Sequence, residues 1–348
     1  MENKYISLVR DNIKNLKPYS SARHEFSGHA DIFLDANENP NDHHIYNRYP
    51  DPLQTRLKRK ISAVKGVKEE SIFLGNGSDE AIDILFRIFC EPGKDSVISI
   101  EPSYGMYRVA ADINNVKIKN VSLTPDFELD VDAILAVEEK SDKILWLCSP
   151  NNPSGNTLNP QMILELLDKF PGMIVVDEAY IDFSNEVSMK SFVPERQNLI
   201  ILQTFSKAWG LAGLRIGMAF AQQWIIEIMN AVKPPYNINS YSQDFVLNQL
   251  RKIDDVRKEI SKIKQERGRV IERLEELDIV EKIYPSEANF LLIKCKDARN
   301  VFKSLQEKGV IVRDRSNVPL CEGCLRVTIG TERENEVFLK EMKILDKQ

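Results

Sequence analysis

Long hydrophobic runs are missing from this chain of 348 residues. No apolar stretch reaches about 18 residues, the length that a membrane-spanning helix needs, so we expect no transmembrane segment. The first residues, Met1 to Lys4, are not followed by the apolar core of a signal peptide. Basic charge is not in excess either, because 47 Lys and Arg stand against 52 Asp and Glu, a net charge of −5. The composition therefore argues against a nucleic-acid-binding protein.

Cysteine and histidine are also scarce. An odd, sparse set of cysteines in a long chain predicts reduced thiols and a cytoplasmic location; the set is Cys90, Cys148, Cys295, Cys321 and Cys324. The last two form one C-x-x-C pair, but a structural zinc site needs a second pair or histidines at ligand spacing. The four histidines all lie far away, between residues 24 and 44. We expect no metal and interpret the pair as two loop thiols.

What the sequence does contain is a regular alternation of short apolar runs and helical patterns. Runs with the composition of strands lie at residues 71–74, 97–100, 116–121, 144–148, 173–176, 199–202 and 216–220. Helical patterns at 78–89, 104–113, 131–137 and 160–170 separate most of them. This alternation predicts an α/β fold with a mostly parallel, seven-stranded sheet flanked by helices.

The pattern changes near residue 238. Apolar residues at helical spacing from Val256 to Leu277 predict a long amphipathic helix. Strand-like segments at 289–295, 310–313 and 325–329, with helices at 298–308 and 332–345, then predict a smaller α+β domain. We therefore expect an N-terminal arm at 1–33 with a short helix at 8–16, joining the small domain, a large domain at 34–238 and a small domain at 239–348.

Chemically reactive residues follow the predicted strands. This placement matters because ligands of parallel α/β sheets bind beyond the carboxyl ends of the strands. Gly77, Ser78 and Asp79 follow the first strand and open a helix, whose free N–H groups can bind phosphate. Asp177 follows a wholly apolar strand, and a carboxylate there needs a partner such as a protonated ring nitrogen.

Lys207 follows the strand predicted at 199–202. A lysine at this position could form an imine with a carbonyl cofactor, while Ser206 and Arg215 hold an anion. The alternative is a solvated turn whose lysine simply ends the strand. The segment alone does not decide between them.

Together these strand-end residues describe a pocket for a phosphorylated pyridine aldehyde. Lys207 would form the imine and move a proton at the reacting carbon, and Asp177 would pair with the ring nitrogen. Asn152 and Tyr180 would hold the ring oxygen, and Tyr104 could stack on the ring. The residues assigned to the cofactor, in addition to Lys207, are Gly77, Ser78, Asp79, Tyr104, Asn152, Asp177, Tyr180, Thr204, Ser206 and Arg215.

A series of motifs, in order and over nearly the whole chain, carries a family resemblance. They lie at residues 37–40 (NENP), 48–52 (RYPDP), 75–80 (GNGSDE), 102–107, 149–155, 176–183 (VDEAYIDF), 204–217, 235–237, 288–290 and 325–331. With them the chain resembles the fold-type-I pyridoxal-phosphate aminotransferases, and among these the histidinol-phosphate aminotransferases. The resemblance implies pyridoxal 5'-phosphate as cofactor. It also implies transamination, in histidine biosynthesis, of the phosphate-ester amine L-histidinol phosphate with 2-oxoglutarate, giving imidazole acetol phosphate and glutamate.

The resemblance also implies roles for residues outside the pocket derived above. Tyr49 would reach the cofactor phosphate of a neighbouring subunit, so a homodimer is expected. Tyr19, Asn37, Arg313 and Arg326 would contact the substrate. Arg326 would accept either a phosphate or a carboxylate, as a guanidinium can bind both. For each arginine the alternative is a surface ion pair.

Three other functions stay open. A threonine-phosphate decarboxylase would keep the cofactor and break a different bond, and an aromatic amino-acid aminotransferase would keep the reaction with another substrate. A non-enzymatic relative could bind a phosphate ligand, although the presence of Lys207, Asp177, Tyr180 and Asn152 argues against this.

Overall fold

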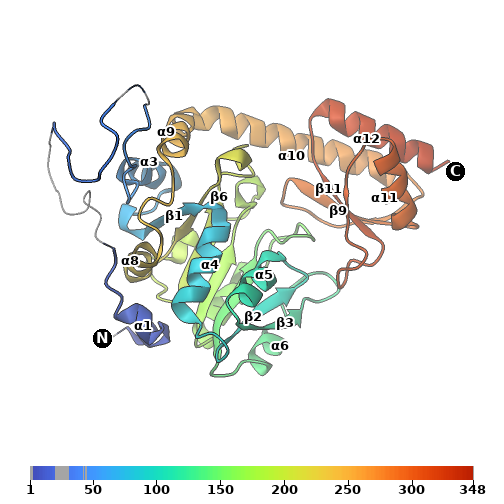
Figure 1. Cartoon of the computed structure of the whole chain (residues 1–348). Coiled ribbons are helices and arrows are strands. Elements are labelled where there is room, and N and C mark those ends of the chain that lie inside the picture. Colours follow the sequence, from blue (N-terminus) through green and yellow to red (C-terminus); the bar gives the residue numbers. More distant parts are fainter. Residues whose placement is uncertain (1–2, 20–30, 42, 44, 348) are drawn as a thin grey trace.

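The computed structural model describes residues 3–19, 31–41, 43 and 45–347, so part of the predicted arm, residues 1–2 and 20–30, lies outside the described residues. Two sheets form the framework, and the long helix α10 (Ile253–Glu275) runs from the larger one towards the smaller one (Figure 1). This arrangement confirms the predicted fold class. The domain boundaries at 33/34 and 238/239 stay a prediction. Within the described ranges, no helix combines the length and apolarity that crossing a membrane requires.

The larger sheet has seven strands in the order β1-β7-β6-β5-β4-β2-β3. Only β7 runs against the others, pairing antiparallel with both β1 and β6. The strands are β1 (Ile72–Asn76), β2 (Ser96–Glu101), β3 (Lys117–Ser122), β4 (Asp142–Cys148), β5 (Met173–Asp177), β6 (Leu199–Thr204) and β7 (Ile216–Phe220). Each of the seven apolar runs in the sequence forms one of these strands.

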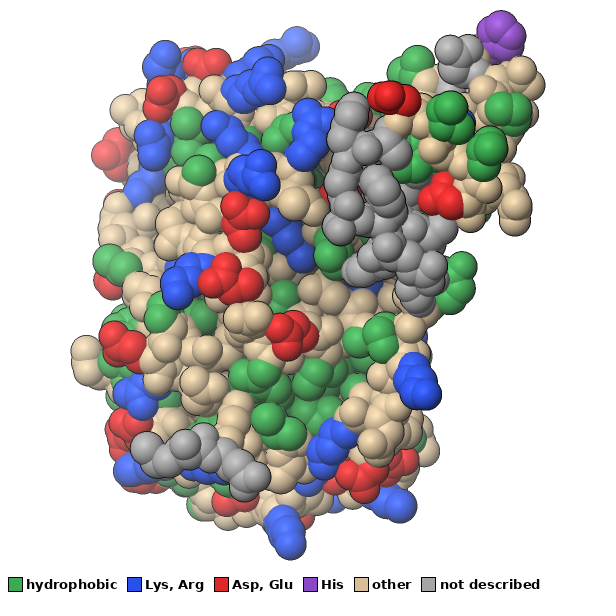
Figure 2. Space-filling view, turned by 90° about the vertical axis from the view of Figure 1, so that its left-hand side faces the viewer, with side chains coloured by type: hydrophobic (Ala, Val, Ile, Leu, Met, Phe, Trp, Pro, Cys, Tyr) green, Lys and Arg blue, Asp and Glu red, His purple; other side chains and the backbone are tan. Residues whose placement is uncertain are grey.

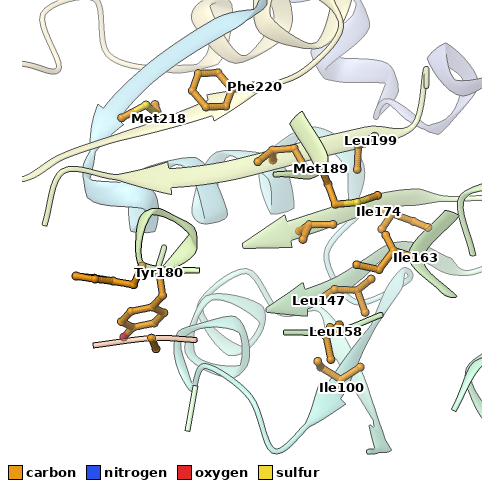
Figure 3. Packing of buried hydrophobic residues seen from close by; sticks show 14 of the residues in the cluster. Ile100, Leu147, Leu158, Ile163, Ile174, Tyr180, Met189, Leu199, Met218 and Phe220 are labelled. Carbon is orange, nitrogen blue, oxygen red and sulfur yellow. The ribbon is translucent and has the colours of Figure 1, made fainter. Parts of the chain in front are cut away.

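Helices cover both faces of this sheet, which explains why its strands are apolar without interruption. Along β6, Leu199 and Ile201 belong to one buried cluster, whereas Ile200 and Leu202 belong to the other. Figure 3 shows the first face, with Leu147, Ile174 and Leu199 side by side on neighbouring strands. Its covering helices are α3 (Thr55–Lys65), α6 (Val131–Ala136), α7 (Pro160–Lys169) and α9 (Ser240–Gln249). The opposite face packs against α4 (Gly77–Phe89), α5 (Met106–Ile113) and α8 (Gln223–Val232).

The smaller sheet has four antiparallel strands in the order β10-β11-β9-β8. They are β8 (Val280–Ile283), β9 (Phe290–Cys295), β10 (Arg313–Asp314) and β11 (Cys324–Thr328). α11 (Ala298–Glu307), α12 (Glu332–Leu345) and part of α10 pack on it around a core of its own. Phe290 and Leu292 of β9 face the other way and join the first cluster of the large sheet. The two sheets thus share packed side chains where they meet.

Short helices occupy the remaining segments: η1 (Lys4–Leu8), α1 (Asp11–Lys14), η2 (Glu69–Ser71), η3 (Ile181–Phe183), η4 (Met189–Phe192), η5 (Ala212–Leu214) and η6 (Leu250–Lys252). The single helix predicted at 8–16 is wrong, because extended Val9 ends η1 before α1 begins. α3 begins at Thr55, because Gln54 before it is left-handed, with φ of 53°. The Asp51 carboxylate accepts from the N–H of Thr55, the first residue of α3.

Candidate active site

One cavity lies at the carboxyl ends of β4, β5 and β6, beside the start of α4. Its lining residues are Gly77, Ser78, Asp79, Tyr104, Cys148, Asn152, Asp177, Ala179, Tyr180, Thr204, Ser206, Lys207, Ala212 and Arg215. Every residue assigned to the cofactor pocket from the strand ends is among them, because parallel strands end at one edge of the sheet. Figure 3 shows Tyr180 beyond the ends of β4 and β5. Cys148, Ala179 and Ala212 are additions that the sequence did not single out.

The first side of the cavity is a cradle at the N-terminus of α4. Gly77 is left-handed, with φ of 71°, and its N–H donates to the Arg215 carbonyl at 2.9 Å. A Cβ on Gly77 would lie 2.6 Å from Nη2 of Arg215, so only glycine leaves room for the guanidinium. That guanidinium also lies 3.2 Å from the Asp79 carboxylate. Free N–H groups at a helix N-terminus beside an arginine are suited to a phosphate.

Two hydroxyl residues extend this cradle. The Thr204 Oγ1 accepts from the Ser206 N–H at 3.0 Å and lies 3.0 Å from the Ser206 Oγ. Behind them, the β7 backbone touches the start of α4, since a Cβ on Gly217 would lie 2.2 Å from the Ser78 nitrogen. The cradle therefore depends on close backbone contact between β7 and α4.

The same cavity is lined by Asp177, the last residue of β5, which is only 2% exposed. Its carboxylate accepts from the Tyr107 hydroxyl at 2.9 Å and from the Ala179 N–H at 3.1 Å. Burial raises the pKa of Asp177 to about 6, although both hydrogen bonds and the charge of Lys207 oppose the rise. No Lys or Arg of the described chain forms an ion pair with it. A cation placed beside Asp177 would therefore be stabilised.

Tyr107 is a site residue that the reasoning from strand ends missed. It is 1% exposed on α5 and stacks on Trp146, with ring centroids 5.0 Å apart. In the sequence it fits the apolar face of a helix, and nothing local indicates that its hydroxyl reaches Asp177. The contact arises because the start of α5 brings the Tyr107 hydroxyl to the carboxylate at the end of β5.

Lys207 lies in the turn that follows β6 and interacts electrostatically with Asp177 and with Asp79 and Arg215 of the cradle. Its Nζ is 5.6 Å from the centroid of the Tyr180 ring. The turn is held by backbone bonds from Gly210 to Lys207 and from Leu211 to Phe205, each 3.0 Å long. Burial lowers the pKa of Lys207, and the charge of Arg326 lowers it further. A larger fraction of the amine is therefore neutral and able to accept a proton or attack a carbonyl.

Asn152 connects the cavity to the smaller sheet. Nη1 of Arg326, on β11, donates to the Asn152 Oδ1, and the Arg326 guanidinium lies 5.3 Å from the centroid of the Phe290 ring. Because Oδ1 is occupied, the amide nitrogen of Asn152 is the group left to donate into the cavity. Arg313 lies directly opposite Arg326 in the β10–β11 pair and is exposed.

The comparison with family models matches residues 27–342 to "Aminotransferase class I and II". This match includes the cradle, Asp177, Lys207 and both sheets. The chain belongs to this family.

Proteins similar to this aminotransferase carry a more specific name. A histidinol-phosphate aminotransferase of Parabacteroides distasonis is 52% identical over 336 residues, which are 97% of each chain. Another of that name, from Christiangramia forsetii, is 50% identical over 98% of each chain. Among solved structures, the histidinol-phosphate aminotransferase of Clostridium acetobutylicum has a TM-score of 0.80, with 24% identity over 87% of this chain and 91% of that one. This structural likeness concerns the fold.

Several residues expected at the aminotransferase site do not line its cavity. Tyr49 is half exposed and stacks on Tyr236, with centroids 4.4 Å apart, and Asn37 lines the same surface groove. The groove belongs partly to the segment 31–50, the blue loop that stands away from the sheets in Figure 1. Tyr19 is also outside, with 73% of its surface exposed. Their roles stay predictions.

The C-x-x-C pair belongs to the first buried cluster, and the interpretation as two loop thiols is wrong for Cys324, which is the first residue of β11. Cys321 and Cys324 are both free and fully buried, and a backbone bond of 2.9 Å closes the turn between them. Within the described ranges, no three His, Cys, Asp or Glu side chains are grouped as metal ligands would be.

Proposed function

We propose that the protein transfers the amino group of L-histidinol phosphate to 2-oxoglutarate, with pyridoxal 5'-phosphate as cofactor. The observation that carries the proposal is that Lys207 shares one cavity with a buried carboxylate and a phosphate cradle. Full-length relatives about half identical to this chain, all named for that substrate, support the choice of substrate.

The residues present fit pyridoxal phosphate. The α4 cradle with Ser206 and Arg215 matches its phosphate, and Asp177, a buried anion without an ion-pair partner among the described residues, matches its protonated ring nitrogen. Asn152 and Tyr180 line the same cavity and would donate to the ring oxygen, Asn152 through its amide nitrogen, because its Oδ1 accepts from Arg326. The cofactor supplies a reactive aldehyde and a ring that withdraws electrons from the carbon next to the substrate nitrogen.

In this proposal Lys207 moves the proton. Its lowered pKa leaves the Nζ more often neutral, so it can take a proton from the substrate carbon and return one. Tyr104, whose hydroxyl lies 3.2 Å from the Asp79 carboxylate, is held against the cavity wall, where its ring can pack on the cofactor.

Arg326 and Arg313 bind the anionic groups of both substrates. They lie opposite each other on β10 and β11, and Arg326 contacts the cavity through Asn152. Among the described residues neither is in an ion pair, which argues against the alternative of a surface salt bridge. One guanidinium can accept the phosphate of histidinol phosphate in one half-reaction and a carboxylate of glutamate in the other.

The active unit is a homodimer in which Tyr49 of each subunit reaches across the interface to the cofactor phosphate in the other subunit. The position of Tyr49 outside its own cavity supports this, as do exposed apolar side chains on the same segment: Ile32, Leu34, Ile45 and Tyr46, with Tyr241 beside the groove. Figure 2 shows exposed hydrophobic side chains on this face of the molecule. Exposed apolar groups gathered in this way are typical of a protein interface.

Amine transfer from histidinol phosphate to 2-oxoglutarate, measured beside phenylalanine and threonine phosphate as donors, tests the substrate. We expect histidinol phosphate to be preferred by at least about tenfold in kcat/KM. Preference for phenylalanine would indicate an aromatic aminotransferase, and carbon dioxide release from threonine phosphate would indicate a decarboxylase. Either result would overturn the proposal.

The cofactor is tested separately. The purified protein with added pyridoxal phosphate should absorb visible light through the bond to Lys207, and Lys207→Ala should lose that band and fall in kcat by at least about a thousandfold. Lys190→Ala, which removes a lysine outside the cavity, is the matched control. A wild-type protein that stays colourless after pyridoxal phosphate is added would contradict the proposed enzymatic function as a whole.

A further inference from the structure

Three arginines project from the same side of the β10–β11 pair. Arg313 lies opposite Arg326, and the ladder continues beyond β10 because the Arg315 N–H donates to the Cys324 carbonyl at 2.9 Å. Side chains two residues apart on an extended strand point to the same face, as do residues directly opposite each other. Arg315 therefore shares the face of Arg313 and Arg326, which is the face towards Asn152 and the cavity.

These three guanidinium groups lack counter-ions within the described part of the chain. Arg326 bonds only to the neutral Asn152 amide, and the side chains of Arg313 and Arg315 make no hydrogen bond or ion pair. The Nε of Arg315 is buried and without a partner. Burial lowers the pKa of Arg315, and the charges of Arg326 and Arg313 lower it further, so the three groups interact.

The surroundings do not neutralise this cluster either. The two potential anions that interact with Arg315, Cys321 and Tyr180, both have a pKa raised by burial, so both are neutral at physiological pH. Arg315 and Arg326 are half-buried, and partly buried positive charges without counter-ions are costly to the fold, so the cluster is suited to an anion that arrives with the substrate.

We propose that Arg315 is a third anion-binding arginine, which favours a doubly charged phosphate over a carboxylate. A phosphate ester carries close to two negative charges at neutral pH and three acceptor oxygens, whereas a carboxylate carries one charge and two oxygens. Two guanidinium groups can already bind both oxygens of a carboxylate, so the third guanidinium finds an acceptor oxygen only when the anion is a phosphate. This inference rests on the proposed function only for the identity of the natural substrate. The preference for phosphate over carboxylate does not depend on it.

Arg315→Met tests the proposal in the cofactor-loaded enzyme, with Arg299→Met as control. Arg299 is exposed on α11, where its guanidinium lies 3.5 Å from the Asn317 side chain, so the control removes the same charge outside the cluster. Binding of inorganic phosphate and of acetate is measured by calorimetry. Arg315→Met should weaken phosphate binding by about tenfold or more and acetate binding by less than about threefold, and the control should change neither.

Kinetics provide the second measurement. Arg315→Met should raise KM for histidinol phosphate by about tenfold, with a smaller rise in KM for glutamate and little change in kcat, and Arg315→Lys should recover part of the loss. Equal weakening of both anions, or unchanged phosphate binding in a folded variant, would overturn the proposal. If histidinol phosphate is not a substrate but phosphate binding still depends on Arg315, the proposed function fails while this inference stands.

Discussion

At the scale of single residues, the site contains charged side chains that have no counter-ion among the described residues until a ligand binds. Asp177 is the clearest case, because a buried carboxylate is ordinarily paired. Its pKa of about 6 lies above the unfolded-state value of 3.8, so the ionised group destabilises the cofactor-free fold. This cost is absent below pH 3.8 and complete above about pH 6.

Asp177→Asn should therefore stabilise the cofactor-free protein at neutral and higher pH. The shift from 3.8 to about 6 corresponds to about 3 kcal/mol in the free energy of unfolding, and the gain should disappear as the pH falls below 4. Urea unfolding of both proteins at a series of pH values measures this. The same variant should lose affinity for the cofactor. A cofactor-free variant that is less stable than the wild type at about pH 8 would contradict the account of Asp177.

Tyr107→Phe should raise the pKa of Asp177 further, because it removes the hydroxyl that donates to the carboxylate. A protonated Asp177 cannot pair with a protonated ring nitrogen, so cofactor affinity should begin to fall at a higher pH than in the wild type. We expect a loss of about tenfold in cofactor affinity near neutral pH. Titration with pyridoxal phosphate, followed by its absorbance, is the measurement. Tyr5→Phe, which alters a buried tyrosine far from the cavity, should leave affinity unchanged.

The sequence predicted the residues that come directly after strands better than those that arrive from elsewhere. Asp177 and Lys207 follow buried apolar strands, and strand order alone brings such positions to one edge. Tyr107 and Arg315 have no comparable signal. Tyr107 is one apolar-face residue of a helix, and Arg315 becomes part of the cluster only through the pairing of two strands far apart in sequence.

At the scale of elements, the contact between β7 and α4 fixes the cradle. Gly217→Ala should disrupt it, because the new Cβ would lie 2.2 Å from the Ser78 backbone nitrogen, which cannot move without displacing α4. Overpacking of this kind costs about 1–3 kcal/mol, so we expect cofactor affinity to fall by roughly tenfold or more. Gly213→Ala is the matched control, since a Cβ there meets no atom within 4 Å. Equal losses in both variants would refute the role given to this contact.

The elements that the sequence missed are weakly marked. β8 (Val280–Ile283) was not predicted, because Glu281 and Lys282 give an edge strand that is mostly exposed. β10 has only two residues, fewer than the segment 310–313 suggested, because Gly309 to Val312 line a groove and do not pair with β11. α8 was also missed, although Ile225, Ile226 and Met229 have the spacing of a buried helical face.

At the scale of the whole molecule, the homodimer predicts complementation between two inactive variants. Tyr49→Ala should lose cofactor affinity and most activity, and Lys207→Ala should be inactive. If Tyr49 acts across the interface, a mixed dimer contains one site with both native residues. Co-expression should then restore up to about a quarter of wild-type activity, since half of random dimers are mixed and each has one intact site. The two variants purified separately and assayed without subunit exchange provide the control. Activity that stays at the level of this control in verified mixed dimers would place Tyr49 in its own subunit's site.

The hydrogen bond between Arg326 and Asn152 joins the proposed anion site to the cofactor cavity. If Asn152 binds the ring oxygen as proposed, one amide is shared by the anion site and the cofactor site, and the two sites are energetically coupled. Linkage is reciprocal: any factor by which a bound anion changes the acidity of the cofactor must equal the factor by which cofactor ionisation changes anion affinity. Titrating the visible spectrum against pH, with and without inorganic phosphate, would yield this coupling free energy directly. The aminotransferase would then report occupancy of its substrate site through its own colour.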